Sequence, residues 1–196
     1  VTLIGKPEDG LVAITDNAAP RIHLGLYRRT TGEQVCSVPL FEAGKSGTDL
    51  SPLAFEHADG SGRGTGHFSI MVENNYGHHV FPMPDPHPGI ARIDAVRQED
   101  GSYRCEQVWQ TAEKGIAGAK LALQSGLLYM YINDANPALG NYFAAIDFNS
   151  GSTVYRQHTG MGHGYNAWQG VLSLHRSQAA IYTTTMFGLV TMQDRP

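Results

Sequence analysis

Side chains that carry oxygen atoms recur at three points where a strand pattern ends. They are Asp16-Asn17, Glu73-Asn74-Asn75 and Asn133-Asp134. Converging carboxylate and amide oxygens suit a hard cation such as Ca²⁺, which takes several oxygen ligands in flexible geometry. The candidate metal ligands are therefore Asp16, Glu73, Asn74, Asn133 and Asp134. The alternative is turn formation, because Asp and Asn side chains bond nearby backbone and tolerate left-handed conformations.

A glycine-rich segment, "HTGMGHGYNAWQG", begins at His158 and adds groups that can transfer protons. Its glycines permit a close approach of backbone to a ligand. His163 is a candidate general acid or base near neutral pH, and Tyr165 a candidate hydrogen-bond donor. The alternative is a tight connection between repeats, with Trp168 packed inside. The catalytic candidates are His163, Tyr165 and Glu73, and the candidates for substrate binding are Asn75, Tyr76, Asn166 and Trp168.

The segment "NNYGHHVFPMPDPHPG" joins two predicted strands with more residues than a hairpin needs, so we consider it a candidate lid. His78 and His79 are adjacent and point in opposite directions in an extended chain. One of them together with His87 is a candidate pair of transition-metal ligands; solvated histidines are the alternative.

Composition excludes several classes of function. The chain has 14 Lys+Arg against 18 Asp+Glu, a formal charge of -4 and no basic stripe, so nucleic acid is not expected as its main partner. No apolar run reaches the roughly 18 residues of a spanning helix, and no leader pattern opens the chain. We therefore expect a mature, soluble protein without a membrane span. The GxSxG and HExxH motifs and phosphate-binding loops are also absent from the sequence.

The pattern of short apolar runs separated by turn residues predicts an all-β protein. The 23 glycines and 10 prolines are scattered between these runs, as expected of many strands joined by tight turns. The strands form four successive groups with approximate bounds 1–45, 46–115, 116–160 and 161–196. Repeats of four short antiparallel strands are typical of β-propeller blades. We expect one partial propeller domain over residues 1–196.

The last group contains three predicted strands where the others contain four. A propeller closes its ring, because open blade edges expose unpaired backbone groups. We therefore expect a ring of six to eight blades, completed by a separate chain or by a segment outside this sequence.

Three segments carry a family resemblance: "YFAAIDFNSGSTVYR", "ARIDAVRQEDGSYRCEQVW" and "GLYRRTTGEQVC". They resemble the repeat of quinoprotein-like (PQQ-repeat-like) propellers, in which an apolar strand, Asp, a Gly-containing turn and a strand ending in Trp follow one another. Quinone-dependent dehydrogenases of that superfamily use adjacent cysteines, which this sequence lacks, so we predict no quinone cofactor. The oxygen-rich loops are similar to those of calcium-dependent lactonase-like propellers, in which the ion polarises a substrate carbonyl.

The two cysteines, Cys36 and Cys105, fall at similar positions in successive groups of strands. A disulfide and two buried thiols are both compatible with this pattern. A disulfide would imply a secreted or periplasmic protein.

Two functions fit these observations. The first is a propeller enzyme that acts on a small molecule at the central channel, by metal-assisted hydrolysis or by lyase or isomerase chemistry. The alternative is a non-catalytic module that binds a protein or a glycan, with aromatic side chains as anchors. The enzyme is slightly favoured, because the polar residues recur on the face that usually holds a propeller's site.

Overall fold

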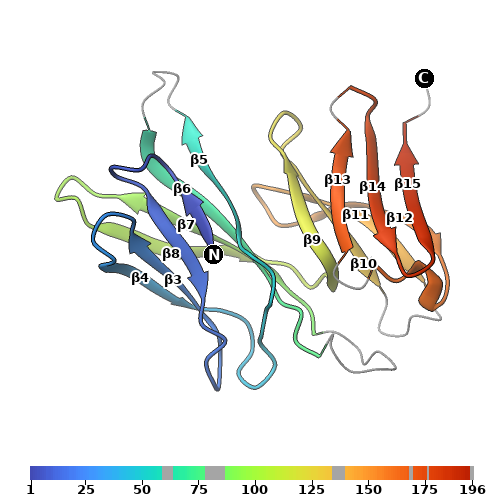
Figure 1. The fold of residues 1–196 in the computed structure, drawn as a ribbon, viewed down its shortest axis with the longest axis horizontal. Coiled ribbons are helices and arrows are strands. Elements are labelled where there is room, and N and C mark those ends of the chain that lie inside the picture. The colour runs from blue at the N-terminus through green and yellow to red at the C-terminus, as the bar shows by residue number, and fades with distance from the viewer. Residues whose placement is uncertain (59–63, 78–86, 134–139, 168–169, 176, 195–196) are drawn as a thin grey trace. The chain divides into compact units, whose positions relative to one another are not determined.

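The described part of the chain folds into β-strands joined by turns and loops, the all-β class that the sequence predicts (Figure 1). The computed structural model describes residues 1–58, 64–77, 87–133, 140–167, 170–175 and 177–194. Within these residues there is no α-helix, and the single helical element is a 3₁₀ turn at His163–Tyr165. None of the described segments is a helix long and apolar enough to span a membrane.

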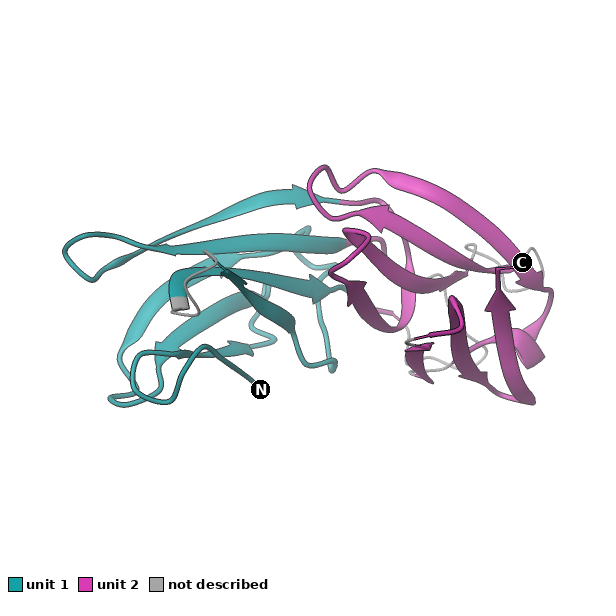
Figure 2. Ribbon diagram, turned by 90° about the horizontal axis from the view of Figure 1, so that it is seen from above, with its two compact units in different colours: residues 1–74, 90–110 teal, residues 75–89, 111–196 magenta. Residues whose placement is uncertain are grey.

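The chain divides into two compact units, coloured separately in Figure 2. Unit 1 comprises residues 1–74 and 90–110, and unit 2 comprises residues 75–89 and 111–196. Each strand overlaps a strand segment predicted from the sequence, although β9 begins at Gly115, before the expected start of the third group at residue 116.

Unit 1 contains two four-stranded antiparallel sheets in which neighbours in sequence are neighbours in space. The first sheet consists of β1 (Thr2–Ile4), β2 (Leu11–Thr15), β3 (His23–Arg28) and β4 (Gln34–Pro39). The second consists of β5 (Leu53–Ala58), β6 (Gly64–Glu73), β7 (Ile90–Arg97) and β8 (Tyr103–Gln110). Apolar side chains at alternate positions of both sheets form one buried cluster that includes Leu24, Leu26, Phe68, Ile70 and Ile93.

Unit 2 contains a seven-stranded sheet with the order β12-β11-β10-β9-β13-β14-β15. Its strands are β9 (Gly115–Ala122), β10 (Leu127–Asn133), β11 (Asn141–Asp147), β12 (Thr153–Gly160), β13 (Gly170–His175), β14 (Ala180–Thr185) and β15 (Gly188–Gln193).

The sequence predicts two separate groups of strands here, whereas β9 and β13 pair in parallel through Gly170↔Ala117 and Val171↔Gly118. Glycine at Gly170 permits the close approach of β14 on the other side of β13, because a Cβ there would lie 2.7 Å from Thr184 O.

The hairpins between the third and fourth strands of three groups share one chemistry. Gly32, Gly101 and Gly151 adopt positive φ angles of 72°, 82° and 72°, which glycine reaches without steric cost. In two of these turns a carboxylate binds the backbone: Asp100 Oδ1 accepts from Ser102 N at 2.9 Å, and Asp147 Oδ1 from Ser150 N at 2.7 Å. Local sequence therefore fixes these three hairpins.

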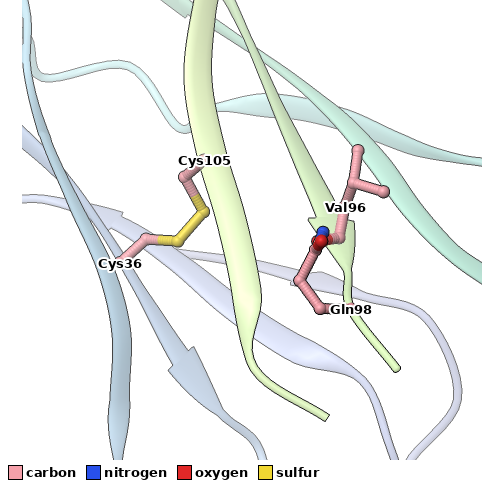
Figure 3. Close-up of a disulfide and its surroundings, with 4 residues drawn as sticks. All are labelled: Cys36, Val96, Gln98 and Cys105. Atoms are coloured by element: carbon pink, nitrogen blue, oxygen red, sulfur yellow. A yellow bond between two sulfur atoms is a disulfide. The ribbon is translucent and has the colours of Figure 1, made fainter. Parts of the chain in front are cut away.

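A disulfide joins the last strands of the two sheets in unit 1, so of the two alternatives left by the sequence the structure contains the bridge (Figure 3). Cys36 on β4 and Cys105 on β8 have Cα atoms 6.3 Å apart, within the range that disulfides span. Beside the bridge, Gln98 Nε2 donates to Val96 O at the end of β7 (2.8 Å). A disulfide is compatible with an extracellular location.

Replacing both cysteines, Cys36→Ser with Cys105→Ser, should lower the free energy of unfolding by about 2–5 kcal/mol, because the bridge closes a long loop and restricts the unfolded chain. Urea unfolding of the oxidised wild type and the double variant measures the change. Equal midpoints, together with two thiols that react in the denatured wild type without reductant, would contradict the bridge.

Candidate functional site

Asp16, the first of the predicted metal ligands, is committed to its own loop. Its Oδ1 accepts from the backbone N of Ala18 (3.0 Å) and of His23 (2.8 Å), and its Oδ2 lies 3.0 Å from His23 Nδ1. Burial opposes ionisation, but these hydrogen bonds and the His23 ring outweigh it, so the pKa of Asp16 lies below its usual value. This geometry is the turn chemistry that the sequence left as the alternative.

Asn17 and Asn74 bind the connection between β4 and β5. Asn17, which has a φ of 49°, donates from Nδ2 to Thr48 O (2.7 Å) and accepts at Oδ1 from Thr48 N (2.9 Å). Asn74 donates from Nδ2 to Lys45 O (3.0 Å) and accepts from Gly47 N (3.2 Å). Both amides therefore shape a loop of unit 1. Glu73 is buried in the same unit, whereas Asn75, also buried, begins a segment of unit 2.

The corresponding position in unit 2 is occupied by Asn133, the last residue of β10. Asn133 is 3% exposed, and neither atom of its amide makes a hydrogen bond to any described residue. Its cross-strand partner is Asn141, the first residue of β11, which is fully buried and whose Oδ1 also lacks a hydrogen bond. Asp134, the other predicted metal ligand here, lies outside the described residues.

The glycine-rich segment is attached to this end of β10 and β11. Asn141 Nδ2 donates to Gly160 O and Gly162 O, both at 3.4 Å. The Tyr131 hydroxyl donates to Tyr165 O (2.8 Å) and lies 2.8 Å from Thr159 Oγ1. Unit 2 thus holds Asn133, Asn141 and the backbone of the 160–165 segment at one end of its sheet.

The predicted catalytic residues of this segment are exposed. The Tyr165 side chain is 41% exposed and lies against Gly160, where a Cβ would be 2.3 Å from the ring. His163 is exposed, and its imidazole contacts no described residue through a hydrogen bond or an ion pair. Asn166 is buried, and its carbonyl accepts from Met186 N at 2.9 Å. Trp168 lies outside the described residues.

The two ends of the candidate lid approach one another. His87 N donates to Tyr76 O (3.1 Å), and the two rings lie 5.6 Å apart. Tyr76, a predicted substrate-binding residue, is 43% exposed. His78 and His79 lie outside the described residues, so the histidine metal site stays a prediction.

A cluster that sequence reasoning missed lies on the second sheet of unit 1. Asp94 on β7 accepts from Arg92 Nε (2.8 Å), Arg92 Nη2 (2.7 Å) and Ser69 Oγ (2.6 Å), and lies 3.0 Å from His67 Nε2. His57 Nε2 lies 2.8 Å from Ser69 Oγ, and the His57 and His67 rings stack at 3.8 Å. We call these five residues the Asp94 cluster.

The Asp94 cluster contains catalytic residue types but is not arranged as a nucleophile triad. The Ser69 hydroxyl is fully buried and lies between His57 and Asp94, whereas nucleophilic catalysis places the histidine between serine and carboxylate. Ligand atoms of His57, His67 and Asp94 lie within 4.8 Å of one another, a spacing that suits a metal ion. A cation would compete with the Arg92 guanidinium, which already binds both carboxylate oxygens.

The contacts within the Asp94 cluster shift the pKa values of Asp94 and His57. Burial alone would raise the pKa of Asp94, but hydrogen bonds from Arg92, Ser69 and His67 outweigh it and hold the pKa below the usual value. Burial and the neighbouring His67 lower the pKa of His57. The signal in the sequence was the alternation of polar and apolar residues in "HFSIMV" and "ARIDAV", which is also typical of a solvent-facing strand.

Comparisons with known proteins assign no family to this chain. No protein-family model matches the sequence, and no curated protein matches it. The resemblance to quinoprotein-like propellers therefore rests on the three repeat segments and stays a prediction.

Asp94→Asn should lower the free energy of unfolding by about 3–5 kcal/mol, because it removes the carboxylate that neutralises the buried Arg92 guanidinium. The matched control is Glu106→Gln on β8, which breaks an exposed pair with Arg104 of the same i, i+2 spacing and should cost less than about 1 kcal/mol. Urea unfolding measures both. Equal losses in the two variants would show that the Asp94 cluster does not stabilise the unit.

His57 should make stability fall as the pH drops from 7 to 5. Its folded pKa lies below the ordinary value of 6.5, so the unfolded chain binds the proton more strongly in this range. His57→Gln should lose less stability than the wild type between these two pH values, measured by urea midpoints. An unchanged pH dependence in the variant would refute the assignment.

Proposed function

We propose that this chain forms blades of a β-propeller and binds a small molecule rich in hydroxyl groups, such as a saccharide, at the loop end of unit 2. The observation that carries the proposal is the buried amide of Asn133, which makes no hydrogen bond to the described residues. This function is the binding-module alternative drawn from the sequence, with a glycan as the ligand.

The arrangement of strands within each unit supports the propeller. Each group is an antiparallel meander, and within each unit the first strands of its two groups lie side by side, β1 with β5 and β9 with β13. In unit 1, Thr2 Oγ1 on β1 donates to Pro52 O, next to the start of β5, at 2.5 Å. In unit 2, β9 and β13 pair directly. Adjacent first strands of successive sheets are what blades around a central channel produce.

The Asn133 amide supports a ligand because an unsatisfied buried polar group is costly. Such a group costs roughly 1–3 kcal/mol in a folded protein, and native structures leave few of them. Two of the loop-end amides, Asn17 and Asn74, have backbone partners. Asn133 therefore differs from them in offering a donor and an acceptor to a molecule that is not part of the chain.

The chemistry of these atoms favours a hydroxyl group over a cation. Ca²⁺ would use Oδ1 of Asn133 and of Asn141 but leave the Nδ2 of Asn133 unsatisfied. A hydroxyl group both donates and accepts, so it satisfies both atoms of the Asn133 amide. The exposed Tyr165 ring, on the segment that Asn141 binds, offers a flat surface for the rest of a sugar.

Binding without catalysis is favoured by the state of His163. A general acid or base must lie within hydrogen-bond reach of the proton it transfers and is usually oriented by a partner. The His163 imidazole is exposed and has no such partner among the described residues. Metal-assisted catalysis with Glu73 and Asp134 stays a prediction from the sequence.

The proposal also covers location and assembly. The Cys36–Cys105 disulfide supports a secreted or periplasmic protein, since disulfides persist in oxidising compartments. Further blades from a separate chain or from a segment outside this sequence would complete the ring, as propellers require closure.

Asn133→Leu separates binding from folding. Leu has the same number and branching of side-chain heavy atoms as Asn and removes the unsatisfied amide, so the unliganded variant should be as stable as the wild type or more stable by about 1–3 kcal/mol. Glucose, galactose, mannose, N-acetylglucosamine and CaCl₂ are each added in thermal unfolding. We expect one sugar to raise the wild-type melting temperature and to have no effect on the variant.

The control for this experiment is Asn149→Ala, which changes an exposed asparagine of the same unit and should leave the sugar response intact. If only CaCl₂ raises the melting temperature of the wild type, the saccharide proposal is wrong and the site binds a cation. If no additive changes the melting temperature, or if Asn133→Leu responds like the wild type, the proposed site is wrong.

A further inference from the structure

Unit 2 contains a cleft of about 840 Å³ at the end of its strands opposite to Asn133 and the 160–165 segment. It lies between the β9–β10 hairpin and the β13–β14 hairpin, and its volume is typical of pockets for small ligands. We propose that this cleft binds a small organic cation with an apolar or aromatic body. The inference is independent of the saccharide site, which uses other residues.

One part of the cleft wall is apolar and aromatic. Leu121, Leu174, Ile181 and Met192 line it together with Tyr129 and Tyr155. Leu174, Met192 and Tyr129 pack against the buried core of unit 2 and are themselves only partly buried. The cleft therefore offers fixed apolar surface to a ligand of matching size, which is how small-molecule pockets gain most of their affinity.

A carboxylate in the cleft favours a cation. Among the described lining residues, Asp194 is the only carboxylate. Asp194 is held near the β13–β14 hairpin, where its backbone N donates to Ala179 O at 3.2 Å. His175 Nδ1 accepts from Ser177 N at 3.3 Å on the same hairpin. An ammonium group in the cleft would find the Asp194 carboxylate as its partner.

The tyrosine pair strengthens this preference. The Tyr129 and Tyr155 rings lie 6.5 Å apart in an edge-on arrangement, and ring faces attract cations through their quadrupole. Burial, Tyr129 and Asp194 together raise the pKa of Tyr155 to about 12, so its hydroxyl stays neutral at physiological pH. The Asp194 carboxylate thus acts on the same space as the tyrosine rings.

Three probes of one shape and different charge test the proposal. Benzylammonium, benzyl alcohol and benzoate are titrated separately into the isotope-labelled chain, and backbone amide shifts are followed by NMR. Benzylammonium should bind at least about tenfold more tightly than benzoate, with benzyl alcohol between them. Shift changes should centre on residues 121–125 and 174–181.

Asp194→Asn should weaken benzylammonium binding about fivefold and leave benzyl alcohol unchanged, because only the charged probe uses the carboxylate. Glu8→Gln is the matched control, since it makes the same change of charge at an exposed position of unit 1. Identical affinities for benzylammonium and benzoate would overturn the proposal. So would an Asp194→Asn variant that binds benzylammonium like the wild type, or the absence of shifts in the cleft with any probe.

Discussion

The alternation of side chains along β6 and β7 is the constraint on which unit 1 depends. A strand sends successive side chains to opposite faces, so the register that buries Phe68 and Ile70 in the core must also send His67 and Ser69 the other way. That second face is also shielded from solvent, with Ser69 fully buried and Arg92 and Asp94 nearly so. The Asp94 cluster supplies the polar partners that these buried groups need, because charges removed from water are stable only when they are paired.

Whether a polar side chain at a strand end has a hydrogen-bond partner separates structural from ligand-binding candidates in this chain. Asp16, Asn17 and Asn74 occur at strand ends, and their side chains bind the backbone of nearby loops. Asn133 occurs at an equivalent strand end, and its side-chain amide makes no hydrogen bond to the described residues. The same residue types at equivalent positions therefore have different roles. The role depends on whether a loop passes within hydrogen-bond distance of the side chain.

The two ends of the sheet in unit 2 offer different chemistry because different residues follow its strands. One end carries the amides of Asn133 and Asn141 and the backbone of the glycine-rich segment, so it suits a ligand with neutral hydrogen-bonding groups. The other carries tyrosines, aliphatic side chains and one carboxylate around an open cleft. Both ends rest on the same core of Tyr131, Phe143, Leu172 and Ile181, so a ligand at either end meets a surface that packing has already ordered.

The sequence by itself determined the local features: the strands, the hairpins at Gly32, Gly101 and Gly151, and the oxygen-rich strand ends. These depend on period-two alternation and turn chemistry, which act over a few residues. Only the tertiary structure decided that Cys36 and Cys105 are bonded, that β9 pairs with β13, and that Ser69 and Asp94 are buried. The alternating sequence pattern is the same whether the polar face of a strand meets water or protein, because contacts between residues far apart in the chain decide what covers that face.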